Sequence, residues 1–136
     1  MKYLFLLYSI LLFGCNTKSK GPLRYDGIYA TPTAQNEHGD SYRRHLKFYD
    51  NGTVISVSSS GTPEQISKWF TKGHENVDEG NYKVEGNNIS FTVSDRGKAG
   101  VEYNGTITDK EHLTLHSKSV ENNHEAESTF IFEEIK

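Results

Sequence analysis

Arg44 is the residue of this chain that most needs a chemical explanation. It shares strand parity with Tyr42 and Leu46, so it should point to the same inner side as these residues. A guanidinium inside a protein is costly unless it is paired. The pattern predicts an anion or carboxylate site in the mouth of the fold, with Tyr42 and Tyr103 as hydrogen-bond donors. The alternative is that Arg44 reaches water at a strand end, or pairs with an internal glutamate.

The six histidines do not predict a metal site. His112 and His116 are four residues apart in an alternating, strand-like segment, where that spacing spans roughly 13 Å. Two imidazoles at that separation cannot bind one zinc ion. Three further groups mix histidine with carboxylates, and each is typical of a solvated loop: Glu37 to Asp40, His74 to Glu79 and His124 to Glu127. We therefore expect no metal and no cofactor.

No constellation typical of catalysis is present in the sequence. It contains no Gly-x-Ser-x-Gly elbow, no His-Glu-x-x-His and no phosphate-binding glycine loop. Glu133 and Glu134 would lie on opposite faces of a strand and could not act together on one bond. We expect no catalytic residues, and hence a protein that is not an enzyme.

The first fifteen residues contain the only cysteine. Lys2 is followed by an apolar run, residues 3–13, that is too short to span a bilayer and is typical of a secretory signal. The sequence Leu12-Phe13-Gly14-Cys15 resembles the lipobox of bacterial lipoproteins. This resemblance implies cleavage before Cys15, acylation (palmitate) of Cys15 and attachment to the membrane. The alternative is an ordinary signal peptide in which the cysteine has no such role.

This resemblance implies a division of the chain. Residues 1–14 would be the signal peptide, residues 15–23 the lipidated Cys15 with a tether, and residues 24–136 the domain. The domain would lie outside the cytoplasm in the cell envelope, and Asn16 after the cysteine indicates the outer membrane. An acylated Cys15 would leave no thiol for a disulfide or a metal.

Composition excludes one class of partner and limits the size of the core. The chain has 18 acidic and 15 basic residues, so nothing favours nucleic acid. Only 34% of its residues are hydrophobic, but 12% are aromatic, and large rings can fill a small interior.

Short alternating segments separated by turn signals predict an all-β fold. The clearest hairpin turns at Asn51-Gly52, because this pair accepts the positive φ of tight turns. Eight strands are expected, near residues 25–30, 42–49, 53–59, 80–85, 88–94, 100–108, 112–118 and 126–133. Closure removes exposed strand edges, which favours an antiparallel up-and-down barrel. A β-sandwich is the alternative.

One segment between the third and fourth expected strands has helical spacing. Its apolar side chains, at i, i+3 and i+4, are Ile66, Trp69 and Phe70. Thr62 is a good N-cap with Gln65 as its capping-box partner, and Gly73 could end a helix of about ten residues. Such a helix should cover an apolar surface, at an open end or a seam of the sheet.

The run from His45 to Glu64, continued by Trp69-Phe70, resembles a small lipocalin-like barrel found in bacterial lipoproteins. Gly27-Ile28-Tyr29 stands where lipocalins carry a Gly-x-Trp that closes the barrel base. The resemblance implies a lipocalin-like barrel with no assigned activity.

Two functions remain open on this basis. The first is a lipid-anchored binding module for a small apolar or amphipathic ligand. The second is a lipoprotein that contacts another envelope protein, as an inhibitor, immunity factor or assembly accessory, with a barrel filled by its own side chains. An enclosed apolar cavity with Arg44 in its wall would favour the first.

Overall fold

The chain folds as an antiparallel β-barrel. The computed structural model describes residues 21–70, 77–95 and 99–135. Within these residues the strands are β1 (Gly27–Ala30), β2 (Ala34–Gln35), β3 (Ser41–Phe48), β4 (Thr53–Ser59), β5 (Asp78–Glu85), β6 (Asn88–Ser94), β7 (Val101–Asp109), β8 (His112–Ser119) and β9 (Glu125–Glu134). Each of the eight expected strands overlaps an observed one. The two-residue β2, which extends a hairpin with β3, was not expected.

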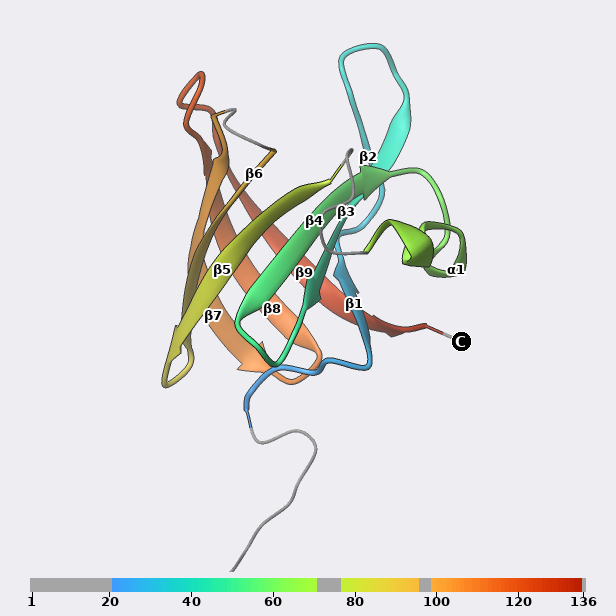
Figure 1. Ribbon diagram of the computed structural model, residues 1–136. Coiled ribbons are helices and arrows are strands. Elements are labelled where there is room, and N and C mark those ends of the chain that lie inside the picture. Colours follow the sequence, from blue (N-terminus) through green and yellow to red (C-terminus); the bar gives the residue numbers. More distant parts are fainter. Residues whose placement is uncertain (1–20, 71–76, 96–98, 136) are drawn as a thin grey trace, which may run out of the picture.

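The barrel closes through β1, which pairs on both sides. From β3 to β9 each strand pairs with the next, and Tyr29 of β1 lies opposite Phe132 of β9 and Leu46 of β3. All these pairings are antiparallel, so the eight strands other than β2 form an up-and-down barrel (Figure 1). The predicted barrel is confirmed, and the sandwich alternative is not observed.

The turns follow the sequence signals. Gly52 and Gly86 have φ angles of 92° and 61°, which favour glycine in the β3–β4 and β5–β6 turns. Asn51 Oδ1 also accepts a hydrogen bond from the Thr53 amide at 3.0 Å. The Asn-Gly pair at Gly105 lies inside β7 rather than in a turn. A Cβ at Gly105 would lie 2.0 Å from the Thr114 carbonyl oxygen, so glycine permits close approach of β8.

The inward side chains of the barrel form a packed aromatic and aliphatic core. Phe48 makes edge-on contacts with Tyr29, Tyr82 and Phe91, at centroid distances of 5.2–5.6 Å. Edge-to-face pairs of this kind stabilise a core beyond their buried area. The buried members of this cluster are Leu23, Tyr29, Leu46, Phe48, Val54, Ile89, Phe91, Val93, Tyr103, Ile107, Leu113, Leu115 and Phe130.

Residues just before β1 seal the barrel at the end opposite Arg44, which we call the closed end. The Tyr29 hydroxyl donates to the Lys110 carbonyl at 2.7 Å and accepts from the Arg24 amide at 2.9 Å. Burial raises the pKa of Tyr29 to about 12. The Arg24 guanidinium lies 3.9 Å from the centroid of the Phe132 ring and pairs with Glu134 at 3.1 Å. Tyr29 therefore occupies the base of the barrel.

The helical segment covers the outside of the barrel. The turn α1 (Pro63–Ile66) continues into the 3₁₀ turn η1 (Ser67–Trp69), which is shorter than expected, and Gly73 lies outside the described residues. The capping box forms, because Thr62 Oγ1 accepts from the Gln65 amide and Gln65 Oε1 accepts from the Thr62 amide.

This segment packs on the seam where β1, β3 and β4 meet. Ile66 and Phe70 are buried against outward residues of the barrel, while Trp69 is half-buried at the rim. The other buried members of this outer cluster are Ile28, Ile55, Val57 and Val77. The apolar face expected from the spacing is thus the face that packs, at the seam rather than at an open end. Within the described residues, no helix is long and apolar enough to cross a bilayer.

Candidate binding site at the barrel mouth

Arg44 points into the barrel, as its strand parity predicts. Its Nη1 donates to the Tyr103 hydroxyl at 3.3 Å, across the interior from β3 to β7. Tyr103 is 3% exposed, so Arg44 reaches a buried phenol. No carboxylate among the described residues lies within ion-pair distance of Arg44. Because a guanidinium carries five N–H donors, most of its donors remain available to a ligand or to water.

Tyr103 forms the floor beneath Arg44. Its ring stacks on Phe91 with a centroid distance of 4.8 Å, and it meets Phe130 edge-on at 6.4 Å. Burial raises the pKa of the Tyr103 hydroxyl, although the neighbouring Arg44 opposes the shift. The phenol therefore stays protonated at neutral pH and serves as a donor or acceptor rather than a nucleophile.

Tyr42 and Arg44 line one hollow of about 420 Å³ at the barrel mouth. We use "mouth" for the end that carries Tyr42, Arg44 and Ser128. The hollow forms because β1 ends at Ala30, so that β3 and β9 are no longer bridged beyond that point. The chain after β1 stays close, since the Arg44 amide donates to Thr31 Oγ1 at 3.0 Å. Of the three residues expected to bind a ligand, Tyr42 and Arg44 thus share the hollow, whereas Tyr103 contacts Arg44 without lining the hollow.

Serines line the inner wall near this floor. Ser117 lies opposite Tyr103 in the β7–β8 register, and Ser128 lies opposite Leu115 in β8–β9. Directly opposed residues share a face of the sheet, so these hydroxyls point inward. The inward serines identified in this way are Ser56, Ser58, Ser117, Ser119 and Ser128. The predicted site does not include them, although serine replaces apolar residues at inward positions of the alternating pattern.

The neighbouring Arg43 has a different role. It points outward, where its guanidinium pairs with Glu133 and its Nε donates to the Thr31 carbonyl at 2.8 Å. This pair joins β3 to β9 across the outer side of β1. Arg43 is thus held by a structural partner, whereas Arg44 faces the hollow.

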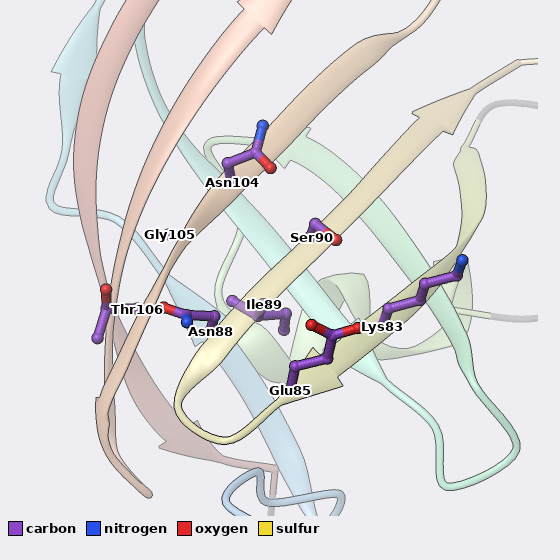
Figure 2. Close-up of a pocket in the computed structure, with 8 residues that line it drawn as sticks. All are labelled: Lys83, Glu85, Asn88, Ile89, Ser90, Asn104, Gly105 and Thr106. Atoms are coloured by element: carbon purple, nitrogen blue, oxygen red, sulfur yellow. The ribbon is translucent and has the colours of Figure 1, made fainter.

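The outer wall of β5, β6 and β7 carries a second polar hollow, of about 460 Å³ (Figure 2). Its lining residues are Lys83, Glu85, Asn88, Ile89, Ser90, Asn104, Gly105 and Thr106. Lys83 and Glu85 bring opposite charges to it, and its other side chains are mostly short amides and hydroxyls. No arginine lines this hollow.

The histidines lie where strand parity places them. His112 and His116 are exposed on the outside of β8, where His112 contacts Asp109 at 2.8 Å and His116 contacts Glu125 at 3.0 Å. Among the described residues no three metal-ligating side chains form a group. His74 and Glu75 lie outside the described residues, as does Cys15.

Comparison of this chain with protein-family models, with curated proteins and with solved structures finds no match. An inward guanidinium above an aromatic floor, with hydroxyl groups in the wall, can hold an oxyanion by charge-assisted hydrogen bonds.

Proposed function

We propose that this protein is a lipid-anchored binding module of the cell envelope that holds a small ligand at the barrel mouth. The observation that carries the proposal is the placement of Arg44. Its guanidinium faces the interior, contacts the Tyr103 hydroxyl and lines a hollow with Tyr42. A charged group in such a position is costly, and a bound anion would offset that cost.

The path of the chain supports the anchoring part of the proposal. Leu23 is buried in the core and Arg24 contacts Glu111 of the β7–β8 turn, so the chain enters at the closed end. Between Cys15 and residue 21 the backbone can span at most about 20 Å. A lipid on Cys15 would thus keep the closed end near the membrane and leave the mouth directed away from it.

Anchoring can be tested on the protein in its host. Acylation predicts a membrane-bound protein whose N-terminal peptide carries the mass of the acyl chains. The variant Cys15→Ala should move to the soluble fraction or remain unprocessed. An unmodified N-terminus after residue 14 would contradict the anchor.

Ligand binding can be tested by native mass spectrometry of the full protein, gently extracted from its host. A retained small molecule would support a binding module, and Arg44→Ala should then lose it. The variant Arg43→Gln is the matched control, because it removes a neighbouring charge that faces outward. If Arg44→Ala retained the small molecule as well as the parent protein does, Arg44 would not be part of the binding site.

A second candidate is a lipoprotein that contacts another envelope protein. The packing of the interior favours this second function. Phe48, Phe91 and Tyr103 are buried, and the Phe91 ring contacts both of the others, so these side chains fill the interior below the mouth. The same mass spectrum distinguishes the two functions. A stoichiometric added protein without a small molecule would support this second function.

A further inference from the structure

The chemistry of the inward side chains changes between the two ends of the barrel. Towards the closed end these side chains are large and apolar, such as Phe48, Ile107 and Leu113. Around Tyr103 and towards the mouth, arginine, tyrosine and serine stand beside smaller apolar side chains, Val93, Val101 and Ala126. A ligand that enters at the mouth therefore meets a mixed wall of hydrogen-bonding groups and small apolar side chains, without the large apolar residues of the closed end.

The aromatic floor limits how deep a ligand can reach. Tyr103 and Phe91 are stacked and only 3% and 6% exposed, and the fully buried Phe130 contacts Tyr103 edge-on. A hydrocarbon chain directed towards the closed end would have to displace these rings from a packed core. Protein interiors are packed as densely as organic crystals, so this displacement is unfavourable.

The wall of the mouth offers hydrogen bonds and charges of both signs. Arg44 carries the positive charge, while Asp78, directly opposite Ser56, has the inward parity and acts on the Tyr103 hydroxyl. The inward hydroxyls of Ser56 and Ser128 stand on strands to either side of the barrel opening. Guanidinium groups recognise carboxylate and phosphate in bidentate geometry. Glu127 shares the hollow but has the outward parity of His116, so it lies at the outer rim.

We propose that the mouth takes a compact, hydroxylated oxyanion, of the class of sugar acids or sugar phosphates, and not a fatty chain. This inference rests on the proposed binding function and specifies its ligand. The hollow of about 420 Å³ lies at the small end of the range usual for ligand pockets, which suits a single ring better than a long chain. The oxyanion would lie on Arg44, with ring hydroxyls on the serines and on Tyr42.

The test is a titration of the mature chain carrying Cys15→Ser, so that no acyl chain competes with the probes. Glucuronate, glucose 6-phosphate, glucose and laurate are added separately while the amide and arginine side-chain signals are followed by NMR. We expect glucuronate, glucose 6-phosphate or both to shift the signals of Arg44 and Ser128 in a saturable way. Neutral glucose and laurate should not. A response to one anion alone identifies the carboxylate or the phosphate as the preferred oxyanion.

Matched variants make the site assignment specific. Arg44→Gln should lower the affinity for the anion by about tenfold or more, and Ser128→Val should lower it by a smaller factor. Arg43→Gln should leave this affinity unchanged. An equal loss in Arg43→Gln would indicate general electrostatic attraction and overturn the inference. Each variant is first checked for an unchanged amide spectrum away from the mouth.

The remaining outcomes separate this inference from the proposed function. Saturable, Arg44-dependent binding of laurate without binding of the sugar anions would overturn the ligand class and keep the binding module. Binding of no probe would also overturn the inference. Whether the protein is a binding module would then still depend on whether native mass spectrometry finds a retained small molecule.

Discussion

Arg43 and Arg44 are adjacent in β3, yet their guanidinium groups lie on opposite sides of the barrel wall. Arg43 pairs with Glu133 on the outside, and Arg44 contacts Tyr103 on the inside. The two-residue period of a strand produces this separation. Two adjacent arginines thus have different roles: Arg43 is structural, and Arg44 is a candidate binding residue.

This division predicts that the two substitutions affect stability differently. Arg43→Gln should lower the free energy of unfolding by about 1 to 3 kcal/mol, because Glu133 and the Thr31 carbonyl both lose a donor. Arg44→Gln should leave it unchanged within about 0.5 kcal/mol or raise it, since functional charges are often kept at a cost in stability. Urea denaturation of both variants measures the difference. A larger loss in Arg44→Gln than in Arg43→Gln would assign Arg44 a structural role.

Tyr29→Phe tests the seal of the closed end. The substitution keeps the ring in the core but removes the hydroxyl that bridges Lys110 and Arg24. We expect a loss of about 1 to 2 kcal/mol in urea denaturation. The control is Tyr42→Phe at the mouth, which lies outside the core clusters and should change stability by less than about 0.5 kcal/mol. Equal losses would show that the closed end does not depend on this bridge.

Gly105→Ala tests the close approach of β7 and β8. Its Cβ would lie 2.0 Å from the Thr114 carbonyl and 2.9 Å from Leu115 Cα, and both are backbone atoms that cannot move alone. We expect a loss of about 2 to 3 kcal/mol or more on thermal unfolding. Gly21→Ala is the control, because its nearest neighbour would be 3.5 Å away, which is ordinary contact. An unchanged melting temperature in Gly105→Ala would mean that the two strands can separate locally.

Most of the fold could be predicted because the local turn and alternation patterns agree with the overall barrel topology. Asn51-Gly52 sets a tight turn, and the alternation on either side of it gives the faces of β3 and β4. Periodicity does not encode how far a helical segment continues. The segment after Thr62 is therefore shorter than the spacing of Ile66 and Phe70 suggested, and its location on the outer seam depends on tertiary packing.

Less of the site could be predicted, for a physical reason. The inward direction of Arg44 follows from parity alone. Its contact with Tyr103 depends on the closure and stagger of the barrel, which bring β3 and β7 across from each other. The opening between β3 and β9 depends on where β1 ends, and strand ends are poorly encoded in sequence.

Thr62→Ala tests the capping box of α1. The variant removes the acceptor of the Gln65 amide and should destabilise the helical turn by about 1 kcal/mol. Trp69 is the only tryptophan of the chain and is half-buried beside this turn, so its fluorescence reports detachment of the helical segment from the barrel. We expect a red shift at lower urea concentration than in the parent. Ser60→Ala, at an exposed neighbouring position, should have no such effect.

His45 should make stability depend on pH. It is fully buried, opposite Ala30 of β1 and Val57 of β4 in the register. Its Nδ1 lies 3.3 Å from the Val57 carbonyl, and its Nε2 has no hydrogen-bond partner in the described part of the chain. Burial is the main cause that lowers the pKa of His45; the charge of Arg43 acts in the same direction and that of Glu133 against it.

The sign of this dependence follows from linkage. Because the folded pKa lies below the unfolded value of about 6.5, the unfolded state binds more protons as the solution is acidified. The contribution of His45 is therefore fully present above about pH 6.5 and is lost as pH falls towards and through the folded pKa. Urea denaturation between pH 7.5 and 4.5 should show this loss, and His45→Leu should reduce it. His38→Gln, on an exposed loop, should keep the parent profile, and an undiminished pH dependence in His45→Leu would assign the effect to other groups.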